Sequence, residues 1–150
     1  MKKILLAVLL SVLALSTLAQ SKTLLNLAKD GLALQGYDPV WFFSDGKPVK
    51  GRPELGFRHK GALYHFASKE HRDAFKSDAA KYEPAFGGYC AVGVSKNKLV
   101  EIDVEAFQIV EGRLLLQYSK GVRDDFNKDI KGNLAKAGAN WPGLVEKKGK

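Results

Sequence analysis

The side chains that could do chemistry in this chain are few. The sequence has one cysteine and three histidines. A thiolate together with imidazoles suits a soft metal ion such as Cu(I) or Zn(II), which takes about two to four such ligands. The sequence shows none of the close ligand spacings that are typical of strong metal motifs. The candidate metal ligands are Cys90, His71, His65 and His59, with His71 as the first choice among the imidazoles.

Each of these residues also has a structural interpretation. A single cysteine is often a small buried hydrophobe, and His71 can be a histidine at the edge of the core that bonds to the backbone. His59 and His65 lie close to a predicted turn, where surface histidines are common. A catalytic Cys90 would need an imidazole within hydrogen-bond reach and a third group to orient it. No Cys-x-x-Cys pair occurs, so we expect a binding module and not an enzyme.

Residues 1–19 have the pattern of a secretory signal peptide. Lys2 and Lys3 precede an almost unbroken apolar run over residues 4–15, and small residues stand before Gln20. The run is too short to cross a bilayer comfortably, so no stable membrane anchor is expected after cleavage. The sequence therefore predicts a periplasmic or secreted protein. A lone cysteine in such an oxidising compartment cannot form an intramolecular disulfide.

The rest of the chain is long enough for one hydrophobic core. We expect a single domain over residues 20–145, followed by a disordered basic tail over residues 146–150. No internal repeat is apparent. The formal net charge is +8, but no compact Lys/Arg cluster is interleaved with aromatic residues, so a nucleic-acid partner is not expected. Weak attraction to anionic lipid or polysaccharide stays open.

The hydrophobic pattern predicts an α+β fold of small antiparallel hairpins packed with helices. Alternating runs flank Lys60-Gly61 and Glu111-Gly112, so we expect two hairpins. Ser68 is expected to cap a helix that reaches about residue 77 and resumes through residue 82. Further predicted elements are a helix over 23–30, a strand over 99–102 and a last helix over 121–129, with an irregular segment after it.

Two turns are expected to hold side chains in place. Asp38 before Pro39 has the pattern of a helix start with an acceptor at the cap. Gly87-Gly88 precede Cys90, and paired glycines allow positive φ, so they would hold the thiol at a specific turn. Large aromatic residues either fill the core or line a pocket for a small ligand or protein partner: Trp41, Phe42, Phe43, Tyr64, Phe66, Tyr89 and Trp141.

Several of these motifs together resemble the YHS domain, a small module found on heavy-metal transporters and in free-standing secreted proteins. The resemblance runs from about Leu25 to Trp141. It implies a small α+β unit built on a hairpin and a following helix, related to treble-clef zinc knuckles. The motifs that carry it are Asp38-Pro39-Val40, Tyr64-His65-Phe66-Ala67-Ser68, Phe75 and Tyr82. Two further stretches, Gly36 to Val40 and Gly87 to Ala91, together resemble the secreted branch of the family.

The resemblance implies a metal site only in part. Metal-binding members carry three cysteines where this chain has Trp41, Ala67 and His71. Only His71 keeps a side chain that can bind a metal, and Cys90 lies outside that set. The sequence therefore predicts capture or sensing of copper or zinc through Cys90 and histidine. The alternative is a metal-free YHS scaffold that binds a protein partner or a small ligand.

Overall fold

The computed structural model describes residues 21–44 and 46–150 of the chain. The predicted signal peptide therefore lies outside the described residues. No helix in the described part is long and apolar enough to span a membrane. The elements in chain order are η1 (Lys29–Gly31), η2 (Leu34–Gly36), η3 (Trp41–Phe43), β1 (Arg52–His59), β2 (Ala62–Phe66), α1 (Lys69–Ser77), α2 (Ala79–Tyr82), η4 (Ala85–Gly88), α3 (Ala91–Ser95), β3 (Asp103–Val110), β4 (Arg113–Gln117), α4 (Lys120–Asn127) and α5 (Ile130–Lys148).

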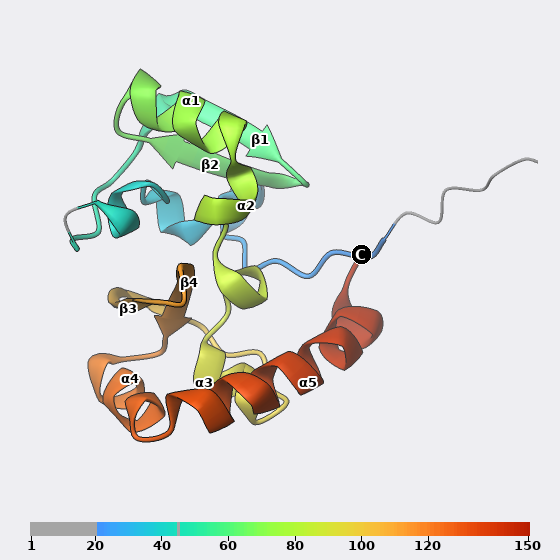
Figure 1. The fold of residues 1–150 in the computed structure, drawn as a ribbon. Coiled ribbons are helices and arrows are strands. Elements are labelled where there is room, and N and C mark those ends of the chain that lie inside the picture. Colours follow the sequence, from blue (N-terminus) through green and yellow to red (C-terminus); the bar gives the residue numbers. More distant parts are fainter. Residues whose placement is uncertain (1–20, 45) are drawn as a thin grey trace, which may run out of the picture.

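Two antiparallel hairpins, each followed by helices, make up the fold (Figure 1). β1 pairs with β2, and β3 pairs with β4. Both turns place two consecutive residues at positive φ, Lys60-Gly61 at 47° and 85° and Glu111-Gly112 at 51° and 73°. A two-residue hairpin turn of the type that matches strand twist requires this conformation. The predicted α+β class and both predicted hairpins are confirmed.

The chain contains an internal repeat, which the sequence analysis did not find. The order η2, η3, β1, β2, α1, α2 recurs as η4, α3, β3, β4, α4, α5. Leu32 bridges Leu63 of the first hairpin in parallel, and Pro84 bridges Leu114 of the second in the same way. We call residues 32–82 unit 1 and residues 84–148 unit 2.

The strand register of unit 1 is reproduced in unit 2. Arg52 faces Phe66 across the first hairpin, and Asp103 faces Gln117 across the second. Both hairpins then contain an irregularity before regular pairing resumes toward the turn. The local conformation before each hairpin also recurs. Three consecutive residues are left-handed in each unit, with φ of 51°, 53° and 82° at Leu34, Gln35 and Gly36 and of 52°, 59° and 84° at Phe86, Gly87 and Gly88.

The helix starts repeat as well. The Ser68 hydroxyl accepts a hydrogen bond from the third helical amide of α1, as predicted, and Ser119 does the same for α4. Asp78 and Asp129 then cap α2 and α5 with nearly equal backbone angles. Side-chain caps of this kind satisfy backbone N–H groups that the helix itself leaves unpaired. Turns and caps thus recur in both units. Side chains of the first helix recur as well, because Lys69, Arg72, Asp73 and Phe75 in α1 match Lys120, Arg123, Asp124 and Phe126 in α4.

Strand β4 lies between two hydrophobic clusters. Leu114 and Leu116 belong to the cluster that contains Phe75, whereas Leu115 belongs to the cluster that contains Phe126. Successive side chains of a strand point to opposite faces, so β4 is buried on both faces. Figure 1 shows it between the first hairpin and helices α3 to α5. Unit 2 thus supplies part of the core of unit 1.

Three predicted elements are wrong. Residues 23–30 are mostly extended instead of helical, because Thr23 and Leu27 form backbone pairs with Lys150 and Ala33. The strand expected over residues 99–102 begins only at Asp103. The segment after residue 129 is the long helix α5, although it contains Pro142. Proline removes one helical N–H, and burial of the apolar side of α5 outweighs that loss.

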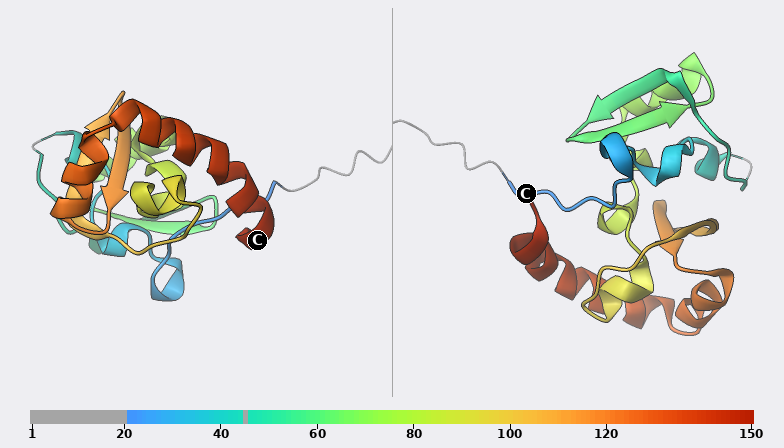
Figure 2. Two further views of the ribbon diagram at one scale, coloured as in Figure 1. Left: turned by 90° about the horizontal axis from the view of Figure 1, so that it is seen from below. Right: turned by 180° about the vertical axis from the view of Figure 1, so that it is seen from behind.

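The predicted disordered tail is also wrong. Helix α5 continues to Lys148, and Lys150 then makes two backbone hydrogen bonds with Thr23, both 2.9 Å long. Lys22 and Glu146 form an ion pair of 2.6 Å beside them. The first described residues therefore lie along the end of α5 (Figure 2). Partners far away in the sequence order this segment, and local composition cannot reveal them.

Phe75 and Phe126 occupy equivalent places in the two units and are completely buried. We expect Phe75→Ala and Phe126→Ala each to lower the free energy of unfolding by about 3–5 kcal/mol, because each leaves a cavity in the core. Urea denaturation followed by circular dichroism measures both. Lys69→Ala and Lys120→Ala are matched controls at exposed equivalent positions. Each should change the free energy of unfolding by less than about 0.5 kcal/mol. A loss below about 1 kcal/mol at either phenylalanine would contradict the described packing.

Candidate functional site

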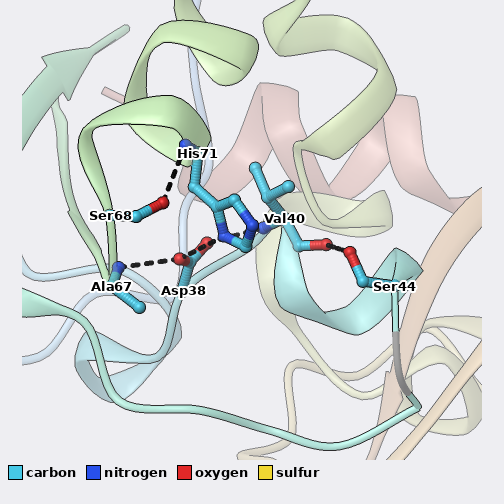
Figure 3. A network of polar contacts seen from close by, with 6 residues as sticks. All are labelled: Asp38, Val40, Ser44, Ala67, Ser68 and His71. Atoms are coloured by element: carbon cyan, nitrogen blue, oxygen red, sulfur yellow. Dashed lines mark hydrogen bonds and ion pairs between the residues drawn. The ribbon is translucent and has the colours of Figure 1, made fainter.

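The buried Asp38 carboxylate joins three segments of unit 1. Its relative exposure is 0%. Oδ1 accepts a hydrogen bond from the Val40 amide at 2.9 Å, and Oδ2 accepts one from the Ala67 amide at 2.8 Å. The same Oδ2 lies 2.8 Å from His71 Nδ1 (Figure 3). Asp38 was predicted to cap a helix that starts at Pro39. The short helix η3 instead starts at Trp41 with Val40 as its N-cap, and the Asp38 carboxyl group bonds to the Val40 amide, to the end of β2 and to α1.

His71 is held in one orientation by this carboxylate. An ionised carboxylate only accepts hydrogen bonds, so Nδ1 carries the proton and donates it to Asp38. The His71 side chain is 21% exposed, and the Trp41 ring lies edge-on to it with 5.2 Å between ring centroids. Trp41 Nε1 is buried without a hydrogen-bond partner among the described residues. An imidazole fixed by a carboxylate can hold a proton or a ligand on its other nitrogen.

Cys90 occupies in unit 2 the place that Asp38 has in unit 1. Its exposure is 1%. The Gln117 side-chain oxygen accepts the Val92 amide at 3.1 Å and the Cys90 thiol at 3.3 Å. The Val92 N–H needs an oxygen acceptor, so the Gln117 side-chain amide is oriented with its oxygen toward Val92. The Cys90 thiol, which lies near the same oxygen, must then donate its hydrogen to it. The thiol is therefore both buried and occupied as a hydrogen-bond donor.

Gln117 thus does in unit 2 what Asp38 does in unit 1. Val40 and Val92 are equivalent residues, and each amide donates to a buried side-chain oxygen. In unit 1 the oxygen comes from the turn itself, whereas in unit 2 it comes from the end of β4. Gln117 was not among the predicted site residues. The similarity of Gly36 to Val40 with residues 88–92 shows only that Cys90 stands where Asp38 does, and no local signal marks Gln117 as the acceptor.

The other two histidines have separate surroundings. His59 Nε2 lies 2.8 Å from Glu83 Oε1, which also pairs with Lys60 Nζ at 3.3 Å. His65 is partly exposed on the outer face of β2. Partial burial, with the nearby Lys50 charge, lowers the pKa of His65 below its ordinary value. Burial alternates along β2, so His65 lies on one face of the strand and Tyr64 on the other.

The predicted metal ligands do not form a ligand set. Cys90 donates to Gln117, His71 is paired with Asp38, and His59 is paired with Glu83. Over residues 21–44 and 46–150, no group of three or more His, Cys, Asp and Glu side chains could hold a metal ion. A copper or zinc site at these residues therefore stays a prediction.

Two neighbouring cavities lie where the N-terminal segment meets the first hairpin turn and the end of α5. Their volumes are about 440 and 280 Å³. They share four lining residues, and we call them together the terminal cleft. The larger is lined by Thr23, Leu24, Leu25, Leu27, Lys60, Gly61, Tyr89, Lys148 and Lys150. The smaller shares Thr23, Leu24, Leu25 and Lys60 and adds Lys22, Tyr64, Glu83, Pro84, Phe86, Gly87, Trp141 and Val145.

The predicted aromatic pocket exists only in part. Tyr64, Tyr89 and Trp141 line the terminal cleft, whereas Phe42 and Phe66 are buried in the core. No protein-family model, curated protein or solved structure matches this chain. The resemblance to the YHS domain therefore stays a prediction that rests on its motifs.

We expect Asp38→Asn to lower the free energy of unfolding by about 3 kcal/mol. The asparagine amide has one oxygen for two backbone donors, and its NH₂ group must face an N–H or the protonated His71 nitrogen. Urea denaturation measures the loss. Asp73→Asn, at an exposed site on α1, is the matched control and should be neutral. A change below about 1 kcal/mol would show that the three contacts of Asp38 contribute little.

The buried, donating thiol of Cys90 should be inert. We expect native protein to react with 5,5′-dithiobis(2-nitrobenzoate) about 100-fold more slowly than protein unfolded in urea, because reaction requires local opening. A Cys90→Ala protein with Ser21→Cys places a single thiol at an exposed site and is the control. A native Cys90 rate close to that of the control would contradict the described burial.

Proposed function

We propose that this chain is a small exported binding module whose terminal cleft takes a small organic ligand. The observation that carries the proposal is the larger cavity of about 440 Å³. Small-molecule sites have volumes of about 300–1,000 Å³ and combine mostly apolar walls with a few polar groups. The terminal cleft meets both criteria. The proposal develops the metal-free alternative that the sequence predicted.

The walls of the terminal cleft support binding of a ligand with an apolar body. Leu24, Leu25 and Leu27 supply aliphatic surface in the larger cavity. The smaller cavity adds Phe86 and Trp141, whose rings pack edge-to-face with centroids 5.8 Å apart. Because the two cavities are neighbours, an elongated ligand could extend from one into the other.

The polar groups of the cleft are few and well placed. The Tyr89 hydroxyl donates a hydrogen bond to the Leu25 carbonyl at 3.3 Å. Burial raises the pKa of Tyr89, so this hydroxyl keeps its proton and retains lone pairs for a ligand donor. Lysine side chains supply the remaining polar contacts. Orientation by a few such groups is typical of ligand sites.

Binding without a covalent step is the function that these residues favour. The Asp38 carboxylate and the Gln117 amide are committed to backbone amides within the fold. The lining of the larger cavity contains no cysteine, histidine or carboxylate that could act as a nucleophile or base. The copper or zinc alternative gains no ligand group from the described residues.

Binding of two related dyes tests the proposal. N-phenyl-1-naphthylamine is uncharged, and 1-anilinonaphthalene-8-sulfonate is the same molecule with a sulfonate. We expect saturable binding of at least one dye to a single site, measured by its fluorescence. Thr23→Phe places a large side chain in both cavities and should weaken binding about tenfold or more, which corresponds to about 1.4 kcal/mol.

Ser21→Phe is the matched control, because Ser21 is exposed and lines neither cavity. It should bind the dye as tightly as the wild type. If neither dye binds, or if Thr23→Phe binds as tightly as the wild type, the terminal cleft is not a ligand site.

A further inference from the structure

We propose that the ligand of the terminal cleft is an amphipathic organic anion, with a carboxylate or sulfonate head on an aliphatic or aromatic body. This inference rests on the proposed function, because it names the chemical class that the same site would select. It follows from the charges of the lining, from the pairing of those charges and from the apolar surface beside them.

The charged side chains that line the larger cavity are all lysines, whereas the smaller cavity adds both Lys22 and Glu83. Lys60, Lys148 and Lys150 contribute ammonium groups, and no aspartate or glutamate lines this cavity. The three lysines come from two distant parts of the chain. Lys60 lies in the turn of the first hairpin, whereas Lys148 and Lys150 lie at the end of α5. Only the tertiary structure brings them to one opening.

Within residues 21–44 and 46–150, two of these three ammonium groups have no aspartate or glutamate partner. Lys60 shares Glu83 with His59. Among the ion pairs of the described residues, none includes the Lys148 or Lys150 side chain. Lysine is a flexible point charge with three donors, so both side chains can turn toward an anionic head group. An ammonium ligand would instead meet like charge.

The position of the lysines is anchored even though their side chains are flexible. Lys150 makes two backbone hydrogen bonds with Thr23, and Lys148 ends α5. The C-terminal end of a helix carries a partial negative charge, which lysines in the last turn offset. The net attraction for an anion is therefore modest, and we expect discrimination of about tenfold at most from exposed charges.

The apolar surface fits the body of such a ligand. Leu25 and Leu27 are partly exposed and lie beside the lysines in the same cavity. An anion whose head meets Lys148 and Lys150 can place its tail along these leucines and toward Trp141. Burial of the tail contributes roughly 0.8 kcal/mol for each CH₂ group removed from water. The tail thus supplies affinity, and the head supplies selectivity.

A matched set of ligands tests this inference on the purified protein. Octanoate, octan-1-ol and octylamine share an aliphatic tail and differ in charge. We expect octanoate to bind about fivefold to tenfold more tightly than octan-1-ol, and octylamine to bind most weakly, as measured by isothermal titration calorimetry. The octanoate affinity should fall as sodium chloride is added, because salt screens exposed charges, whereas the octan-1-ol affinity should not.

Two double variants locate the selectivity. Lys148→Gln with Lys150→Gln should remove most of the preference, so that octanoate and octan-1-ol bind this variant with similar affinities. Lys136→Gln with Lys147→Gln removes the same charge from exposed sites on α5 outside the cleft lining. This control should keep more of the preference for octanoate over octan-1-ol than the Lys148/Lys150 double variant does. Circular dichroism checks that both proteins fold.

The outcomes separate this inference from the proposed function. Equal binding of octanoate and octan-1-ol, tighter binding of octylamine, or equal effects of the two double variants would overturn the anion inference and leave the cleft a ligand site. If none of the three compounds binds and neither dye binds, the proposed function fails and the inference fails with it.

Discussion

The backbone amide of a valine, bonded to the oxygen of a fully buried side chain, is the constraint on which both units depend. Three consecutive left-handed residues precede each valine by one turn of chain; Val40 is buried and Val92 half-buried, and their acceptors Asp38 and Gln117 are fully buried. A buried N–H without an acceptor costs about 1–3 kcal/mol. Each unit therefore carries a buried side-chain oxygen for this amide, from Asp38 in unit 1 and from Gln117 in unit 2.

The two acceptors have different consequences. Asp38 carries a charge into the interior and is paired with His71, which is itself 21% exposed. Gln117 is neutral, and its second contact is the Cys90 thiol. Unit 1 thus holds a hydrogen bond between a carboxyl group and an imidazole at the place where unit 2 holds one between an amide and a thiol. The two units share the turn and differ in the chemistry of its polar contact.

The repeated units do not form separate cores. Strand β4 of unit 2 contributes Leu114 and Leu116 to the cluster around Phe75, and Leu115 to the cluster around Phe126. The N-terminal segment adds Leu24 to the second cluster and pairs with the end of α5. The terminal cleft lies at this closure of the chain, so its lining comes from segments that are far apart in sequence.

The sequence by itself determined the local structure. Tight turns and helix caps depend on neighbouring residues. The hairpins at Lys60-Gly61 and Glu111-Gly112 and the start of α1 at Ser68 could therefore be predicted. Only the tertiary structure decided what depends on distant partners. The extended segment from Thr23, the ordered Lys150, the Gln117 acceptor and the terminal cleft are of this kind. The physical reason is that a long-range contact can override local propensity, and composition does not encode which distant segments meet.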